Sequence, residues 1–285
     1  MSADVFAFTN RIVLISGGSS GIGAYLAQGL AVAGDGNNRI YIVGRRAAAL
    51  ASTASASAHA SSIIPLSGDV SSIAGCQKVA ADFVEAEKNA GVAEDKIQLD
   101  LLVNNAGILR GEGSAPPEAS VEELAESLLK ASDDDWRVEM AVNVGSIQWL
   151  SASLLPYLVR AASTGKRDGR GNIVVNTSVS AFNQTPPFHL YCASKAAAHS
   201  VTQSLARALT PRGVRVNSIA PANVPSEMNS LSNPASFVSK LKDSMPVGRI
   251  GEPEDVVAAV VYLASRAGSY VSGTVIAVDG GVLLT

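Results

Sequence analysis

The sequence is poor in the residues that build disulfide frameworks and metal sites. It has two cysteines, Cys76 and Cys192, and three histidines in 285 residues. Two cysteines cannot form a disulfide framework or, by themselves, a four-ligand zinc site. The histidines, at positions 59, 189 and 199, do not cluster at ligand spacing. We therefore expect free thiols, no metal and a reducing compartment.

Excess charge of one sign and long hydrophobic runs are also missing. Twenty-two basic residues against 25 acidic ones give a net charge of −3, which offers no basic surface to nucleic acids or anionic membranes. The longest apolar run, Val256–Ala264, has nine residues, whereas about 20 are needed to cross a bilayer. Residues 1–10 lack the basic start and apolar stretch of a signal peptide. We expect a cytoplasmic protein with no nucleic-acid or membrane partner.

Aromatic residues are few, at 5%, while 47% of residues are hydrophobic and 25 are glycine. Such an apolar fraction with a small net charge argues against disorder. The length allows one large α/β domain or two small ones, and either can bury a sizeable core. Because no segment is long or polar enough to be a linker, we expect one domain over residues 1–285.

Short β-branched runs alternate with Ala-rich stretches, as in parallel sheets with crossover helices. The expected strands are Ile12–Ser16, Ile40–Val43, Ile63–Leu66, Leu99–Asn104, Ile173–Thr177, Val214–Ile219 and Thr274–Val278. The expected helices are 21–33, 46–59, 72–90, 120–131, 134–160, 191–210 and 253–265. Most strand candidates are continuous apolar runs, which indicates a doubly wound α/β sheet of about seven strands with helices on both faces.

Two long irregular segments, 109–119 and 221–235, each follow a predicted strand. Long loops in a compact α/β domain are usually functional. Ligands of open parallel sheets bind outside the carboxyl ends of the strands. We expect these two loops to form the mouth of the site.

A glycine-rich turn, Ser16–Gly23, joins the first predicted strand to the first predicted helix. Gly17, Gly21 and Gly23 allow a tight turn, close approach to a pyrophosphate and close packing of the helix. The helix N-terminus offers free N–H groups and a positive dipole end. Such a short motif also arises by chance in a glycine-rich sequence. Its position favours a dinucleotide site in a Rossmann-like fold.

The end of the second predicted strand reads Tyr41–Arg46 and contains no acid. NAD sites usually have an acid here for the ribose hydroxyl, whereas NADP sites have a basic group for the 2′-phosphate. Arg45 can donate bidentate, charge-assisted bonds to a phosphate. The alternative is that Arg45 and Arg46 simply open the second helix in water. We predict NADP(H) as the cofactor.

Tyr191 and Lys195 are four residues apart in a predicted helix and should share one face. A phenol with a pKa of about 10 is a poor acid unless a nearby cation favours its ionised form. Lys195 can supply that cation. A tyrosine–lysine pair at this spacing is also common by chance, so the alternative is an ordinary surface pair.

These motifs occur together in one order, with further matches between them. The order is the turn at 16–23, Asp69-Val70 after the third strand, Asn104–Gly107 after the fourth, Asn143 in a helix, Ser178 after the fifth strand, Tyr191 with Lys195, and Pro221 after the sixth. Over nearly its full length the sequence resembles the single-domain short-chain dehydrogenase/reductase family. It is similar to the 3-oxoacyl-carrier-protein reductase-like carbonyl reductases of that family.

The resemblance implies a role for each reactive residue. Tyr191 would protonate the carbonyl oxygen as general acid, and Ser178 would hydrogen-bond that oxygen. Lys195 would lower the pKa of Tyr191 and bind the nicotinamide ribose, and Asn143 would complete a proton relay through water. The implied activity is NADPH-dependent reduction of a ketone or aldehyde to an alcohol. The alternatives are a secondary alcohol dehydrogenase acting oxidatively and a non-catalytic NADP(H)-binding sensor or scaffold.

The resemblance also implies a set of cofactor contacts along the chain. The residues are Gly17, Ser19, Ser20, Gly21, Ile22, Gly23, Arg45, Arg46, Asp69, Val70, Asn105, Ala106, Gly107, Tyr191, Lys195, Pro221 and Val224. The sequence departs from the family after the sixth strand, where Pro-Gly is usual and Pro221-Ala222 stands here. Loss of that glycine narrows the conformations open to the turn, and its methyl group could narrow the channel.

The expected substrate side mixes apolar and polar residues without a basic cluster. They are Leu109, Phe182, Gln184, Phe188, His189, Met228 and Phe237. This composition favours a neutral ketone or aldehyde over an acidic metabolite. The resemblance also implies a homotetramer or dimer, with helices 134–160 and 191–210 pairing with a symmetry mate and residues 265–285 forming another interface.

Overall fold

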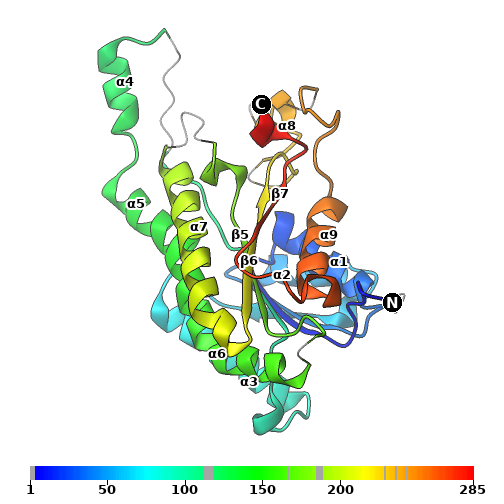
Figure 1. Cartoon of the computed structure of the whole chain (residues 1–285). Coiled ribbons are helices and arrows are strands. Elements are labelled where there is room, and N and C mark those ends of the chain that lie inside the picture. Colours follow the sequence, from blue (N-terminus) through cyan, green and yellow to red (C-terminus); the bar gives the residue numbers. More distant parts are fainter. Residues whose placement is uncertain are drawn as a thin grey trace.

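A seven-stranded parallel sheet organises the protein (Figure 1). The computed structural model describes residues 4–111, 118–165, 167–183, 189–227, 229–234, 236–241 and 243–285. The strands are β1 (Ile12–Ser16), β2 (Arg39–Gly44), β3 (Ile63–Ser67), β4 (Leu101–Asn104), β5 (Asn172–Asn176), β6 (Arg215–Pro221) and β7 (Val275–Val278). Each predicted strand is confirmed, with ends that differ by at most two residues.

The strand order is β3-β2-β1-β4-β5-β6-β7, so the chain reverses direction across the sheet beside β1. Strand β1 pairs with β2 on one side and with β4 on the other, where Val13 lies opposite Leu101. The helix that follows β1 covers one face of the sheet and the long helix that precedes β5 covers the other. Open α/β sheets have their ligand crevice at such a point, outside the carboxyl ends of the strands. This is the Rossmann-like doubly wound arrangement that the sequence predicted.

Helices cover both faces of the sheet (Figure 1). They are α1 (Gly21–Ala33), α2 (Ala47–Ser55), α3 (Ile73–Asn89), α4 (Val121–Leu128), α5 (Asp133–Met140), α6 (Ser146–Thr164), α7 (His189–Leu209), α8 (Phe237–Leu241) and α9 (Pro253–Ala264). Successive residues of a strand point to opposite faces. Accordingly, Leu14 of β1 lies in the core under α3, α6 and α7, whereas Val13 and Ile15 lie in the core under α1, α2 and α9.

The central strands are buried on both faces and the edge strands are not. All residues of β1, β4 and β6 are buried. The apolar runs of β1 and β4 predicted this, whereas β6 also buries the polar residues Arg215, Asn217 and Ser218. In β3 only the first residue is fully buried, and β7 is partly exposed along its length. Edge strands have a neighbour on one side only, which leaves part of their surface uncovered. Within the described ranges, no helix is long and apolar enough to span a membrane.

The predicted helix 134–160 is wrong as one continuous helix. The structure has α5, then a π-helical segment Ala141–Gly145, then α6. The side chain of Asn143 in this segment bonds both backbone groups of Ile108, at 2.8 Å each. A single π turn inserted in an α-helix re-aims the side chains that follow it and is frequent at functional sites. The break therefore comes from a contact with a distant loop, which the apolar pattern of 134–160 does not contain.

Two other predicted helices are too long at their carboxyl ends, and the one over 120–131 ends at Leu128. The helix predicted over 46–59 ends at Ser55. There the Ser55 hydroxyl bonds the carbonyl of Ser52, and the Ser57 hydroxyl accepts from the His59 N–H. Serine side chains compete in this way with helical bonds. The short helix α8 follows the irregular segment 221–235 and was not predicted.

Candidate active site

The glycine turn after β1 packs against the loop that follows β4. Gly17 has φ +69°, a conformation that favours glycine, and a Cβ there would lie 2.8 Å from the Cα of Ala106. A Cβ on Gly23, in the first turn of α1, would collide with the carbonyl oxygen of Gly17. Close packing of the turn against the first turn of α1 and the loop after β4 therefore requires both glycines.

The N-terminus of α1 is not capped by its own residues. Ser20 stands at the N-cap position, but its hydroxyl makes no capping hydrogen bond. The first-turn N–H groups and the positive end of the helix dipole are suited to an anion. A Cβ on Gly21 would lie 2.9 Å from the Cβ of Ser226, so the loop after β6 approaches this turn. Ser19 and Ile22 are partly exposed beside it.

Asn105 ties three strand ends together. Its amide group donates to the carbonyls of Ser16 and Gly17, at 3.0 and 3.1 Å, and accepts from the amide group of Asn176 at 2.8 Å. The Ser16 hydroxyl accepts from the backbone N–H groups of Asn105 and Ala106, each at 3.1 Å. The ends of β1, β4 and β5 are thereby fixed relative to one another, with Ala106 and Gly107 at their centre.

The two arginines after β2 are exposed, and Arg46 is already engaged. Its guanidinium donates to the carboxylate of Glu227 at 2.8 Å and to the Ser20 hydroxyl at 3.3 Å. The hydrogen bond from Arg46 is the main cause that holds the pKa of Glu227 below its ordinary value, and the Ser20 hydroxyl adds to it. Nothing in the sequence singled out Glu227, because its partner is 181 residues away in the chain. Arg45 is exposed beside this pair.

The remaining residues proposed for the cofactor line the same end of the sheet. After β3, Asp69 is exposed and its carboxylate accepts from the Ser71 N–H at 2.9 Å, while Val70 is buried. Pro221, the last residue of β6, and Val224 in the loop after it are buried. These residues follow strands at the carboxyl edge, where the sequence placed them.

Ala222 does not strain the turn after β6. Among the described non-glycine residues, positive φ occurs at Asn10 and Asp35 only. Ala222 therefore adopts a backbone conformation open to any residue. Its N–H donates to the Val278 carbonyl at 3.1 Å. The missing glycine is accommodated without the conformational cost that the sequence suggested.

Tyr191 and Lys195 share one face of α7, as predicted. The Lys195 ammonium lies 5.5 Å from the centroid of the Tyr191 ring, and it donates to the carbonyl of Asn176 at 3.1 Å. The lysine side chain is buried, with 4% of its surface exposed. Burial lowers the pKa of Lys195 to about 8, and the nearby Glu139 carboxylate opposes that shift. The interpretation as an ordinary surface pair is therefore wrong for Lys195.

Ser178 lies just past the end of β5 and is 9% exposed. Its hydroxyl accepts from the Ser180 N–H at 3.1 Å and so caps the short 3-10 helix Val179–Ala181. That short helix packs against α7, the element that carries Tyr191. The structure thus brings the strand end and the reactive helix together.

Asn143 and Gly107 lie against Lys195. Besides its two bonds to Ile108, the Asn143 amide group donates to the Ser194 hydroxyl at 2.9 Å. A Cβ on Gly107 would lie 3.4 Å from the Lys195 nitrogen and 3.5 Å from the Asn143 side-chain oxygen. The buried cluster also contains Glu139, which the sequence did not single out; its carboxylate accepts from the Ser194 hydroxyl at 3.2 Å.

Part of the expected substrate side can be placed. Leu109 is partly exposed after β4, His189 begins α7, and the Phe182 ring stacks edge-on against His199 with 5.0 Å between centroids. Gln184, Phe188, Met228 and the side chain of Phe237 lie outside the described residues.

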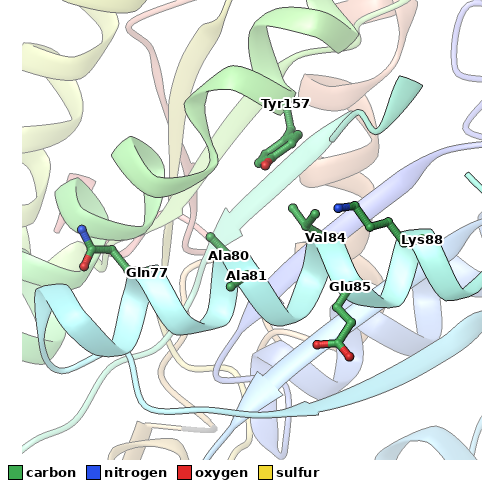
Figure 2. Close-up of a pocket in the computed structure, with 7 residues that line it drawn as sticks. All are labelled: Gln77, Ala80, Ala81, Val84, Glu85, Lys88 and Tyr157. Atoms are coloured by element: carbon green, nitrogen blue, oxygen red, sulfur yellow. The ribbon is translucent and has the colours of Figure 1, made fainter. Parts of the chain in front are cut away.

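A hollow elsewhere on the surface is not this site. Figure 2 shows it between α3 and α6, lined by Gln77, Ala80, Ala81, Val84, Glu85, Lys88 and Tyr157. None of these residues belongs to the motifs, and the hollow lies away from the carboxyl ends of the strands. The motif residues lie instead at the crevice, at the carboxyl ends of the strands.

Comparison with known proteins identifies the family. The family model described as enoyl-(acyl carrier protein) reductase matches residues 17–283. The short-chain dehydrogenase/reductase PhomF of Diaporthe leptostromiformis is 32% identical over 99% of this chain and 94% of its own length. The chain belongs to the short-chain dehydrogenase/reductase family. It is therefore an oxidoreductase.

A further relative and a solved structure are similar to this chain over almost their full lengths. The rhamnolipids biosynthesis 3-oxoacyl-[acyl-carrier-protein] reductase of Pseudomonas aeruginosa is 35% identical, covering 97% of each chain. The solved structure of the Pseudomonas aeruginosa RhlG/NADP active-site complex has a TM-score of 0.79 and 33% identity, covering 98% of each chain.

Proposed function

We propose that this oxidoreductase is an NADPH-dependent carbonyl reductase, which converts a ketone or aldehyde to an alcohol. The observation that carries the proposal is the buried Lys195 ammonium 5.5 Å from the Tyr191 ring, at the carboxyl edge of the sheet. A protein that only binds a nucleotide has no need of this pair beside Ser178.

The crevice fits a dinucleotide because its backbone leaves no room for side chains and its helix N-terminus lacks a cap. The turn from Gly17 to Gly23 would hold the pyrophosphate, Arg45 and Arg46 the 2′-phosphate, and Asp69 with Val70 the adenine. The residues from Asn105 to Gly107, with Pro221 and Val224, would line the nicotinamide half. When bound there, NADPH supplies a hydride to the carbonyl carbon.

The residues of the chain would provide the proton and the stabilisation of charge. Tyr191 donates its hydroxyl proton to the carbonyl oxygen, so that one carbonyl, one hydride and one proton give one alcohol. The Ser178 hydroxyl donates a hydrogen bond to the same oxygen and stabilises its developing charge. The Lys195 cation stabilises the resulting tyrosinate, and Asn143 with Lys195 links the site to water that returns the proton.

A panel of ketones, β-ketoesters and the matching alcohols, assayed with NADPH and NADH, tests the activity. We expect NADPH-dependent reduction of neutral ketones, with lower kcat/KM for analogues that carry a carboxylate, because Leu109, Phe182 and His189 present no cationic cluster. Turnover only of alcohols with NAD would instead support the oxidative dehydrogenase. Cofactor binding without any turnover would support the sensor or scaffold.

Cofactor choice is tested by titrating NADPH and NADH against variants at the end of β2. We expect Arg46→Ala to weaken NADPH binding about 10- to 100-fold, the usual worth of a charge-assisted bond to phosphate, with little change for NADH. Glu227→Gln should strengthen NADPH binding, because Glu227 competes with the 2′-phosphate for Arg46.

Lys78→Ala serves as the matched control, because Lys78 forms an exposed ion pair with Asp82 on α3. That variant should bind both cofactors like the unmodified protein. A tighter Kd for NADH than for NADPH in the unmodified protein would overturn the assignment to NADP(H).

A further inference from the structure

One carboxylate of the site, that of Glu139, is not used in the proposed proton transfer. Glu139 lies in the last turn of α5 and is fully buried, whereas Asp133 and Asp134 at the start of the helix are exposed. Burying a carboxylate is costly unless it is well bonded.

The hydrogen bonds to Glu139 come from three uncharged groups of the site. One carboxylate oxygen accepts from the backbone N–H of Arg110, at 2.8 Å, in the loop that follows Gly107. The other accepts from the Ser194 hydroxyl at 3.2 Å and from the Asn143 amide at 3.4 Å. Glu139 thus joins the loop after β4, the π-helical segment and α7, the three elements that surround Lys195.

These bonds compensate the carboxylate only in part. The Ser194 hydroxyl also lies 2.8 Å from the carbonyl of Tyr191, so that its single proton is shared between two acceptors. Burial raises the pKa of Glu139, while the Arg110 N–H, the Ser194 hydroxyl and the charge of Lys195 lower it. A buried anion with weak bonds gains most from a nearby cation.

Lys195 is the cation of the same buried cluster. A Cβ added to Gly107 would lie 3.4 Å from its nitrogen and 3.5 Å from the side-chain oxygen of Asn143, whose amide donates to Glu139. The lysine donates to a neutral carbonyl, that of Asn176, so this bond brings no opposite charge. Burial lowers the pKa of Lys195 and Glu139 raises it. The other titratable groups near Glu139 are Tyr191 on α7, whose carbonyl shares the Ser194 hydroxyl, Arg110 in the loop and Asp135 on its own helix.

The guanidinium of Arg110 lies beside two other carboxylates and not beside that of Glu139. It lies 3.7 and 3.8 Å from the carboxylates of Asp134 and Asp135, and the Arg110 side chain is 45% exposed. Solvent and these acids screen its charge from the buried cluster. The Glu139 and Lys195 charges therefore act chiefly on each other.

We infer that Glu139 is a positioning residue for the reductase reaction: its negative charge retains the Lys195 ammonium in the buried site, and its hydrogen bonds hold Asn143 and Ser194 beside it. The inference rests on the proposed function for its catalytic consequence. The effect of Glu139 on the charge of Lys195 does not depend on the proposed function and can be measured without substrate.

The direct test is the variant Glu139→Gln, which keeps the shape and one acceptor oxygen but removes the charge. A carboxylate raises the pKa of a neighbouring ammonium, so its loss lets Lys195 give up its proton at lower pH. We expect the alkaline limb of kcat/KM for ketone reduction to move down by about half to one pH unit. Glu139→Asp, which keeps the charge, should restore the alkaline limb.

Glu87→Gln controls for the loss of any buried carboxylate. Glu87 is also fully buried, but it bonds Arg39 and Tyr41, each at 2.6 Å, under a different part of the sheet. This variant should lose stability without moving the pH profile. A pH profile of Glu139→Gln identical to that of the unmodified protein would overturn the inference, whatever its kcat.

NMR titration of the lysine side chains separates this inference from the proposed function. The Lys195 resonance, assigned by its loss in Lys195→Met, should titrate near the pKa of about 8 in the unmodified protein. In Glu139→Gln it should titrate at lower pH. An unchanged Lys195 titration contradicts the inference even if no ketone is reduced, whereas a shifted titration without ketone reduction contradicts only the proposed function.

Discussion

Replacing Tyr191 with phenylalanine is expected to remove carbonyl reduction while leaving NADPH binding nearly intact. The substitution deletes only the hydroxyl that donates the proton and keeps the ring that lies over Lys195. Loss of a positioned general acid typically costs 10²- to 10⁴-fold in rate, so we expect kcat to fall by about 10³-fold or more. Single-turnover kinetics with NADPH and a titration of NADPH binding measure the two quantities separately.

Tyr157→Phe provides the matched control. Tyr157 lies on α6 beside the hollow of Figure 2, outside the crevice, and loses the same single oxygen. Its variant should retain the kcat of the unmodified protein. If Tyr191→Phe also retained that kcat, the assignment of the proton donor would be wrong.

Gly23→Ala is expected to weaken both the cofactor site and the fold. A Cβ at this position collides with the Gly17 carbonyl and lies 2.5 Å from the side-chain nitrogen of Asn105, so backbone must move. Overpacking of this kind costs about 1–3 kcal/mol. Because the moving part is the phosphate-binding turn, we expect NADPH affinity to fall about 10- to 100-fold and the urea midpoint to fall as well.

Gly91→Ala separates the local effect from a general loss of stability. Gly91 has φ +83° and no heavy atom within 4 Å of an added Cβ. It should cost about 1–2 kcal/mol of left-handed strain with no change in NADPH affinity. Unaltered NADPH binding by Gly23→Ala would show that the turn is not the phosphate site.

The parts of the fold that depend on local sequence were predictable. A strand buried on both faces needs an unbroken apolar run, and Val13, Leu14 and Ile15 show it. The glycine turn was predictable because backbone packing against Ala106 excludes every other residue at Gly17. Helical spacing predicted that Tyr191 and Lys195 share one face of α7, but not that Lys195 is buried.

The parts that depend on distant partners were not predictable. The π-helical break at Asn143 comes from bonds to Ile108, 35 residues away, and the apolar pattern of the segment does not show them. Glu139 belongs to an acidic helix whose other acids are solvated or surface-paired, so its burial becomes visible only when α7 is placed against α5. The ion pair of Glu227 with Arg46 was likewise not predictable, because the two residues are far apart in the sequence.

A labelled hydride tests the proposed NADPH-dependent reduction of a ketone most directly. NADPH carrying deuterium at both hydrogen positions of the hydride-donating carbon is incubated with the protein and a neutral ketone, and the product is analysed by mass spectrometry. The account predicts an alcohol with one deuterium on its carbinol carbon, formed by the unmodified protein and not by Tyr191→Phe. Absence of deuterated alcohol with every neutral ketone of the panel, despite bound NADPH, would contradict it.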